Sequence, residues 1–319
     1  MRVLFLGGTG PVGHAAVPLL LADDHELALA HSGRHQPPER TQVEQLLGER
    51  STLLAPQGPV ERWEPEVVID TFAGGATAAK ATELGQMAKR AGVQQLIAIS
   101  SVDVYRQAAD AGVDDHEVVE LARGSIPIHE DAPKREAHAS AAGRAHDNVV
   151  MEAALGGAPR VTVLRPGAIY GMHANPRVAR EWFLVAKVAA GDDRLELPLG
   201  GTQLFHRVAL ERVAAAIAAA PKHAPADYWA CNVCDPQLLS FGALARLVAD
   251  VLDWTWRIEP VDWRSDNENP WGVRHPVVAD VRRLEQVLGV LEPDPQAATV
   301  AQIEWLWANR ESLAELDLA

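Results

Sequence analysis

The sequence predicts an α/β fold in which a doubly wound parallel sheet is joined to a smaller C-terminal domain. Short apolar segments suited to buried strands alternate with apolar or Ala-rich helical segments along the chain. The first of these strands runs directly into a glycine-rich turn and a helix. With 319 residues, 48% of them apolar and 23% charged, the chain has the composition of a globular protein that buries a core.

The charge balance restricts the partners. The chain has 29 Lys and Arg against 43 Asp and Glu, a net charge of −14, and it lacks the basic stripe with which proteins bind nucleic acid or anionic lipid. It also lacks an apolar run of about 18 residues, the length needed to span a bilayer. We therefore expect a cytoplasmic protein with a small-molecule substrate, and neither nucleic acid nor a membrane as partner.

The strongest local signal lies in the first thirty residues. Arg2–Leu6 is a predicted buried strand, glycines follow at three-residue spacing, and His14–Ala22 reads as a helix. Glycine is needed there because the backbone must turn tightly, approach a pyrophosphate and let the helix pack near the strand, while the helix N-terminus offers N–H groups to phosphates. The sequence thus predicts a Rossmann-type dinucleotide site. Its expected residues are Gly7, Thr9, Gly10, Pro11, Val12 and Gly13.

The residues after the second predicted strand, Leu27–Ala30, indicate which dinucleotide binds. An acidic side chain there would bind the ribose of NAD, but the chain continues as His-Ser-Gly-Arg-His. The hydroxyl of Ser32 and the guanidinium of Arg34, separated by Gly33, suit a 2′-phosphate. We therefore expect NADP(H) in preference to NAD(H). The alternative is that Arg34 is a solvated loop charge.

Further elements follow at the spacing that a doubly wound sheet requires. Strands are predicted at Glu66–Thr71, Gln95–Ser101 and Val161–Leu164. In a parallel sheet, ligands bind at the carboxyl ends of the strands. Helices are predicted at 75–91, 177–190, 209–220, 241–252 and 297–309.

A series of motifs in a fixed order resembles a known family. After the glycine turn come Phe72-Ala73-Gly74, Ser100-Ser101-Val102-Asp103-Val104-Tyr105, Leu164-Arg165-Pro166, Ile169-Tyr170-Gly171, Cys231-Asn232-Val233-Cys234-Asp235-Pro236 and His275-Pro276-Val277-Val278-Ala279-Asp280. Together they resemble the extended short-chain dehydrogenase/reductases, the family of NAD-dependent epimerases and dehydratases, over nearly the whole chain. The resemblance implies a nucleotide-binding domain of residues 1–171, to which 205–236 return, and a substrate-binding domain of 172–204 and 237–319.

The resemblance also implies residues of the site. Ser101 matches the family serine that hydrogen-bonds the substrate oxygen. Members commonly pair through two helices beside the sheet, so a homodimer is one expectation. Further cofactor contacts are expected from Phe72, Ala73, Gly74, Ser100, Asn148, Pro166, Gly167 and Ile169.

One departure from the family pattern concerns proton transfer. The family carries Tyr-x-x-x-Lys on a helix, where the Tyr exchanges the proton and the Lys lowers its pKa. Aligning the acid that follows this motif to Glu152 places Asn148 at the Lys position and Arg144 at the Tyr position. No tyrosine in the chain is followed by lysine four residues later. The proton must come from elsewhere, or the nucleotide is used without net redox, or catalysis has been lost.

Three side chains are candidates for the missing proton donor. His138 and His146 flank the start of this helix, and Tyr105 ends the motif that contains Ser101. Each has a structural alternative, a solvated histidine or a packed tyrosine. The polar stretch 106–124 looks inserted and is either a lid or a loop.

The sequence therefore favours an NADP(H)-dependent oxidoreductase, a ketoreductase or an epimerase/dehydratase, acting on a small cyclic or sugar-like substrate. The alternative is an inactive nucleotide-binding regulatory or scaffold protein. No metal site is expected, because Cys231 and Cys234 form a single C-x-x-C without a second pair. The tryptophans in the last third of the chain either line a binding site for a ring-bearing ligand or fill the core of the smaller domain. They are Trp254, Trp256, Trp263, Trp271, Trp305 and Trp307.

Overall fold

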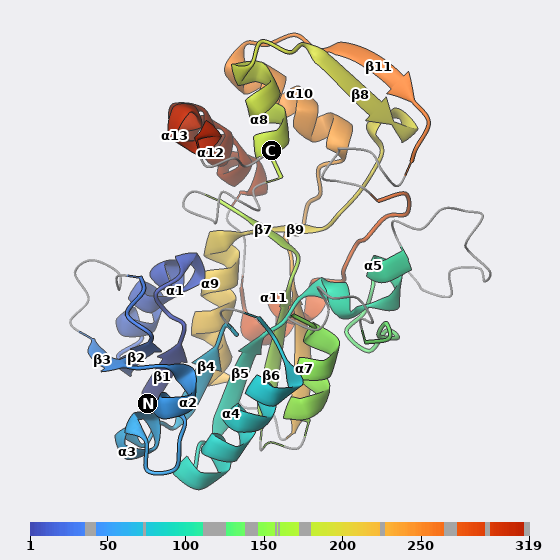
Figure 1. Ribbon diagram of the computed structural model, residues 1–319. Helices are drawn as coiled ribbons and strands as arrows, with labels where there is room; N and C mark the ends of the chain where they lie inside the picture. The colour runs from blue at the N-terminus through green and yellow to red at the C-terminus, as the bar shows by residue number, and fades with distance from the viewer. Residues whose placement is uncertain are drawn as a thin grey trace.

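A seven-stranded parallel sheet forms the centre of the computed structural model (Figure 1). The structure describes residues 1–35, 43–72, 75–110, 126–137, 146–156, 158, 160–171, 180–223, 227–264, 273–290 and 294–315. Within this part of the chain the strand order is β10-β6-β5-β4-β1-β2-β3. The strands are β1 (Arg2–Leu6), β2 (Glu26–His31), β3 (Glu44–Leu47), β4 (Val67–Asp70), β5 (Gln95–Ile99), β6 (Val161–Pro166) and β10 (Tyr228–Val233). The predicted doubly wound parallel sheet is confirmed.

The strand order reverses at β1. The chain first adds β2 and β3 on one side of β1 and then returns to place β4, β5, β6 and β10 on the other. Leu4 of β1 lies opposite Ala28 of β2 and Val68 of β4. In open α/β sheets, ligands bind in the crevice at such a reversal, at the carboxyl ends of the strands.

Helices cover both faces of the sheet. On one face α1 (Pro11–Ala22), α9 (Leu210–Ala219) and α11 (Arg282–Leu288) pack on Val3 and Phe5 of β1. On the other, α4 (Ala78–Ala91), α7 (Asn148–Leu155) and the short α2 (Arg50–Leu53) and α3 (Pro59–Trp63) pack with the alternate residues Leu4 and Leu6. Because both faces are covered, residues Val3–Leu6 of β1 are all apolar rather than alternating with polar ones.

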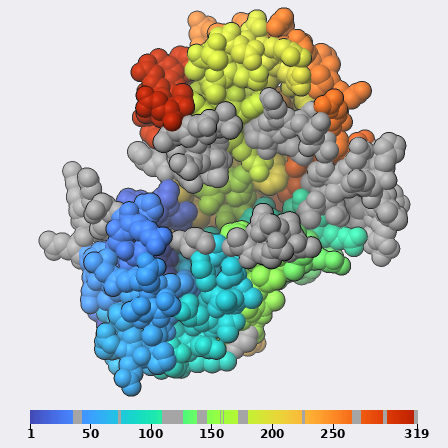
Figure 2. Space-filling model, in the orientation of Figure 1, coloured from blue at the N-terminus to red at the C-terminus, as the bar shows by residue number. Residues whose placement is uncertain are grey.

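A second lobe lies beyond the carboxyl edge of the sheet. Helices α8 (Trp182–Ala189), α10 (Phe241–Leu252), α12 (Pro295–Ala308) and α13 (Arg310–Ala314) share a separate apolar core. A two-stranded sheet of β8 (Arg194–Pro198) and β11 (Arg257–Val261) lies beside them. In Figure 2 the sheet half, coloured blue to cyan, forms the lower part of the molecule, and the yellow to red segments of the second lobe form the upper part.

Short elements connect the sheet and the lobe. The strands β7 (Ala168–Tyr170) and β9 (Arg207–Ala209) pair in parallel between them (Figure 1). The remaining described elements are α5 (Arg106–Asp110) and the 3₁₀ turns η1 (Val102–Val104), η3 (Leu199–Gly201) and η4 (Ala220–Lys222). None of the helices in the described ranges has both the length and the apolar character needed to cross a membrane.

Candidate functional site

The turn between β1 and α1 has the geometry that its glycines predict. Gly7 has a φ of 76°. A Cβ on Gly13 would lie 2.1 Å from the carbonyl oxygen of Gly8, so the helix packs against the turn only with glycine there. A Cβ on Gly10, by contrast, would meet nothing nearer than the Gly7 oxygen at 3.8 Å. No side chain caps the first turn of α1, which leaves its N–H groups open to a phosphate.

A cavity of about 560 Å³ lies over this turn, at the carboxyl ends of β1, β2 and β4. Its volume is in the range of cofactor and small-molecule sites. The glycine turn, the segment after β2 and the segment after β3 all contribute to the wall. The lining residues are Leu6, Gly7, Thr9, Gly10, Ala30, His31, Ser32, Arg34, His35, Gly48, Glu49, Arg50, Leu53, Asp70 and Lys80.

The segment after β2 brings Ser32 and Arg34 into the cavity wall, with Gly33 between them at a φ of 80°. Arg34 is 74% exposed, and its Nη2 lies 3.3 Å from Oε1 of Glu49, which is 68% exposed. Sequence reasoning missed Glu49 because it follows β3, not β2. A carboxylate therefore lies in the cavity wall after β3, where none follows β2.

The β4 side of the cavity holds a buried carboxylate. Asp70 is 1% exposed, and its Oδ2 accepts a hydrogen bond from Arg50 Nη2 at 2.6 Å. Its Oδ1 accepts from the backbone N–H of Phe72 at 2.7 Å, which holds that residue at a φ of 48°. Lys80 donates to the carbonyl of Gly75, and burial together with the nearby Arg50 lowers the pKa of Lys80. No sequence motif marks Arg50 or Lys80, because their positions in the wall depend on how α2 and α4 pack in the fold.

A polar cluster lies at the carboxyl end of β5. Ser101 Oγ accepts a hydrogen bond from the Asp103 N–H at 3.2 Å, which leaves the serine proton for another acceptor. Asp103 Oδ1 accepts from Asn148 Nδ2 at 3.0 Å, and its Oδ2 lies 3.4 Å from Arg135 Nη2. Asn148 is buried, whereas the Asp103 carboxylate is 42% exposed. The cluster therefore presents a serine hydroxyl and an accessible carboxylate together.

His146 borders this cluster. Its Nδ1 accepts a hydrogen bond from the N–H of Ala76, and its Nε2 lies 3.4 Å from Nδ2 of Asn148. Because Nδ1 acts as the acceptor, the neutral ring carries its proton on Nε2. His138 and Arg144 lie outside the described residues, as do Ala73, Gly74 and positions 111–124 of the inserted stretch.

The side chain of Ser100 does not join the Ser101–Asp103 cluster but belongs to a buried hydrogen-bond network around Glu152. Its hydroxyl donates to Glu152 Oε1 at 2.6 Å, and Arg165 donates to both oxygens of the same carboxylate. Lys134 Nζ lies 2.6 Å from Glu152 Oε2. Burial opposes ionisation of Glu152, but the hydrogen bonds from Arg165, Lys134 and Ser100 outweigh burial and lower the pKa of Glu152 to about 2.

Tyr105 is a core residue. Its hydroxyl donates to Asn232 Oδ1 and accepts from Arg165 Nη1, and its side chain is fully buried. Burial raises the pKa of Tyr105 well above its usual value. The geometry thus favours the packing alternative for this tyrosine over proton donation.

The β6–β7 segment is held against the rest of the site by backbone contacts. The Gly167 N–H donates to the Val233 carbonyl, and a Cβ at Gly167 would lie 2.4 Å from the carbonyl oxygen of His206. Pro166 and Ile169 flank this glycine at the end of β6 and in β7. Whether they contact a cofactor stays a prediction, as it does for Phe72, Ser100 and Asn148.

Metal chemistry has no support in the described part of the chain, where no group of three or more His, Cys, Asp or Glu side chains is placed to hold a metal ion. Cys231 and Cys234 are both buried free thiols, and burial raises the pKa of each.

No family model and no curated protein matches the chain, but solved structures do. MoeE5 in complex with UDP-glucuronic acid and NAD is 18% identical, covering 98% of this chain and 100% of its own, with a TM-score of 0.70. UDP-glucose 4-epimerase from Thermotoga maritima is 16% identical (98% and 100% covered, TM-score 0.68). DesIV, a dTDP-glucose 4,6-dehydratase from Streptomyces venezuelae, is 17% identical (98% and 98% covered, TM-score 0.68). At these identities the matches show the fold, which is the one that the sequence resemblance implied.

The same comparisons overturn the expected preference for NADP(H). The structures of MoeE5, DesIV and WbmG from Bordetella bronchiseptica all hold NAD. The local geometry gives the physical reason why the prediction was wrong. Arg34 already has a carboxylate partner in Glu49, which would repel a 2′-phosphate and accept hydrogen bonds from ribose hydroxyls.

Proposed function

From the fold shared with nucleotide-sugar epimerases and dehydratases, we propose that this chain is an NAD(H)-dependent oxidoreductase of the epimerase/dehydratase type, acting on a small cyclic or sugar-like substrate. One observation supports it most. A cavity of about 560 Å³ over the glycine turn opens at the same sheet edge that carries Ser101 and Asp103. NAD(H) bound there would supply a hydride acceptor and donor.

The chain's own groups suit such a ligand. The open first turn of α1 faces the pyrophosphate, and Gly10 allows the backbone to approach it. Glu49 accepts hydrogen bonds from the adenosine ribose. We further propose that residues 1–171 and 205–236 bind the cofactor, with 172–204 and 237–319 binding the substrate.

Asp103 is the general base in this proposal. When a substrate C–H gives up hydride, the attached hydroxyl loses its proton to the Asp103 carboxylate, and a carbonyl forms. Ser101 donates a hydrogen bond to the same oxygen. Asn148 and Arg135 hold the carboxylate in place, at 3.0 Å and 3.4 Å. Asp103 thereby takes the role of the tyrosine that the chain lacks.

Calorimetric titration of NAD⁺ and NADH into the wild type and two alanine variants tests the cofactor site. Gly10→Ala places a methyl group where the ligand approaches, without a clash inside the protein, and we expect at least about tenfold weaker binding. Gly85→Ala, on α4, makes only an ordinary contact with Ala158 and should bind like the wild type. If the wild type binds neither nucleotide, the oxidoreductase proposal fails. Equal binding by Gly10→Ala would place the ligand elsewhere.

The missing Tyr-x-x-x-Lys pair favours a second candidate, a nucleotide-binding regulatory or scaffold protein without catalysis. The two candidates differ in whether hydride is ever transferred. Incubating the protein and NAD⁺ with UDP- and dTDP-sugars, and following the absorbance of reduced nicotinamide and the sugar products, separates them. Binding of NAD⁺ without conversion of any sugar would favour the second candidate.

A further inference from the structure

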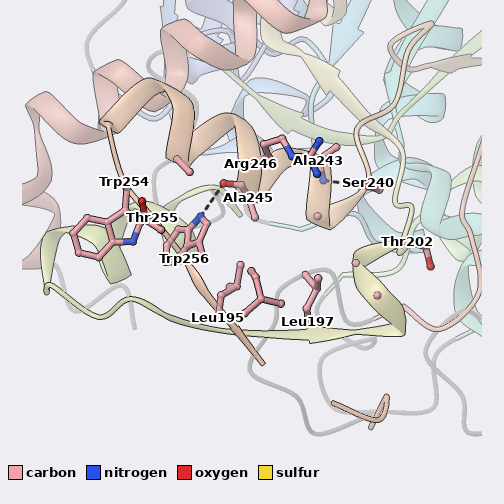
Figure 3. Close-up of a pocket in the computed structure, with 15 residues that line it drawn as sticks. Leu195, Leu197, Thr202, Ser240, Ala243, Ala245, Arg246, Trp254, Thr255 and Trp256 are labelled. Carbon is pink, nitrogen blue, oxygen red and sulfur yellow. Dashed lines mark hydrogen bonds between the residues drawn. The ribbon is translucent and has the colours of Figure 1, made fainter. Parts of the chain in front are cut away.

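A second cavity, of about 520 Å³, lies in the C-terminal lobe between α10 and the β8–β11 sheet (Figure 3). We call it the lobe groove. It shares no residue with the cavity over the glycine turn. Its lining residues are Leu195, Leu197, Gly200, Gly201, Thr202, Ser240, Gly242, Ala243, Ala245, Arg246, Ala249, Trp254, Thr255, Trp256 and Ile258.

The floor of the lobe groove is apolar. Leu195 and Leu197 are alternate residues of β8 and therefore share a face, on which they point toward α10 (Figure 3). Ile258 pairs with Leu195 in the parallel register, so it lies on that face too, and it is 46% exposed. Leu195 is fully buried, so a flat ring resting on Leu197 and Ile258 would remove the remaining apolar surface of the floor from water.

Two indoles close one end of the lobe groove. The rings of Trp254 and Trp256 meet nearly edge to face, with centroids 6.1 Å apart and an interplanar angle of 72°. Trp256 Nε1 donates to the Ala245 carbonyl at 2.9 Å. Trp254 Nε1 is buried and has no hydrogen-bond partner among the described residues. A buried donor without an acceptor is unfavourable, and a ligand oxygen at this end would relieve it.

A cation lies along the wall. Arg246 is on α10, between the tryptophan end of the lobe groove and the start of the helix at Phe241 (Figure 3). It is exposed, and no residue in the described ranges forms an ion pair with it. Among the residues that the structure describes, the lobe groove thus combines an apolar floor, an N–H donor without an acceptor at one end and a cation without an ion-pair partner further along.

We propose that the lobe groove binds an elongated planar aromatic carboxylate. Its ring lies on Leu197 and Ile258, a polar oxygen at one end accepts from Trp254 Nε1, and the carboxylate at the other end pairs with Arg246. An aromatic acid with oxygen atoms at both ends, such as 4-hydroxycinnamate, has this arrangement of groups. The lobe groove lies within the segments proposed to bind the substrate, but it shares no residue with the dinucleotide cavity, so its occupancy can be tested separately from NAD⁺ binding.

Fluorine NMR on the full chain labelled with 5-fluorotryptophan tests the proposal. Phe substitutions at Trp254 and Trp256 assign the two resonances, and 4-hydroxycinnamate is the probe. Both resonances should shift saturably, while that of Trp229, which packs on His223 in the sheet half, should not. The uncharged 4-hydroxycinnamamide should bind about tenfold more weakly, because it cannot pair with Arg246.

Matched variants locate the site. Arg246→Gln should weaken binding of the acid about tenfold and remove the difference between acid and amide. Arg257 is an exposed cation that directly precedes Ile258 on β11. The control variant Arg257→Gln removes this charge and should leave binding unchanged. Ala249→Leu fills the lobe groove and should abolish the shifts, with circular dichroism confirming the fold. Unsaturable or absent shifts, equal binding of acid and amide, or unchanged binding in Ala249→Leu would overturn the proposal. NAD⁺ titrated in parallel tests the other cavity separately.

Discussion

Asn148 changes the electrostatics of the proposed proton-transfer site. The family pattern has a lysine at this position, whose charge lowers the pKa of a neighbouring tyrosine. A neutral amide cannot supply that charge, but it can donate a hydrogen bond, and Asn148 donates one to Asp103. The cluster at the end of β5 therefore suits a carboxylate base better than a phenol acid.

The Asp103→Asn variant should separate proton transfer from binding. Asparagine keeps the size of the side chain but cannot accept the substrate proton, so we expect turnover of an identified substrate to fall by roughly 10²- to 10⁴-fold. NAD⁺ affinity, measured by calorimetry, should stay within about twofold of the wild type. Ser101→Ala is the companion variant, and unchanged turnover in it would remove Ser101 from the mechanism. Full activity of Asp103→Asn would assign the base elsewhere.

The buried carboxylate of Glu152 is predicted to stabilise the folded protein. Glu152→Gln leaves Arg165 and Lys134 without their carboxylate in a buried site, and breaking a buried pair from one side costs about 3–5 kcal/mol. Glu259→Gln removes an exposed partner of Arg194 and should cost no more than about 1 kcal/mol. Urea unfolding of both variants measures the difference. Equal losses would mean that the Glu152 network is not stabilising.

Sequence reasoning predicts the candidate residues that a motif carries and gives no signal for those that the fold brings beside them. Gly10 and Gly13 follow from strand, turn and helix in immediate succession. Glu49 and Arg135 reach the site from segments that show no signal of their own, one after a four-residue strand and one in a loop. Arg34 was interpreted without its partner, and for that reason the dinucleotide was predicted wrongly.

At the scale of elements, long helices with clear ends were predicted best. α10 spans Phe241–Leu252 as expected, because Ser240 caps its start and Asp253 ends it in a left-handed conformation. α1 begins at Pro11 rather than His14, since proline is favoured in the first helical turn. The strands β3, β7, β8, β9, β10 and β11 were not predicted. Of these, β3, β7 and β9 have only three or four residues and are too short to show a period, and each exists because a partner strand lies beside it.

The close contact between α1 and the glycine turn predicts that two glycine-to-alanine substitutions change the free energy of unfolding in opposite directions. Gly13→Ala would place a methyl group 2.1 Å from the Gly8 oxygen, and we expect a loss of about 1–3 kcal/mol or more in the free energy of unfolding. Gly85→Ala, in the interior of α4 with room for a methyl group, should stabilise by roughly 0.5–1 kcal/mol. Denaturant unfolding measures both. A neutral Gly13→Ala would mean that α1 packs less closely on the turn.

At the scale of the whole molecule, His206 joins segments that are far apart in the sequence. It is 2% exposed, its Nδ1 accepts from the Ala279 N–H at 2.8 Å, and its Nε2 donates to the Asp235 carbonyl at 2.6 Å. Acceptance at Nδ1 needs the neutral ring, whereas Nε2 can donate to the Asp235 carbonyl whether the ring is neutral or charged. Burial lowers the pKa of His206 to about 4, and the positive charge of Arg212 acts in the same direction.

This histidine predicts how stability depends on pH. Between pH 6.5 and about 4 the unfolded chain binds a proton at His206 that the folded protein does not bind, so stability is complete above pH 6.5 and falls as the pH is lowered through this range. The expected loss is about 3 kcal/mol. Urea unfolding at pH 7, 5.5 and 4 measures it, and His206→Gln should show a shallower dependence over the same range. An identical slope in that variant would assign the acid sensitivity to other groups.

The place of β10 at the edge of the sheet also affects the order in which strands can pair during synthesis. During synthesis β6 leaves the ribosome well before Tyr228–Val233, the strand that pairs with it. Because synthesis proceeds at roughly 5–20 residues per second, the edge of β6 stays unpaired for several seconds before β10 is made. An unpaired edge of this kind is open to pairing with another chain. The rate of translation through residues 167–227 should therefore affect how much of the newly made protein reaches the folded state.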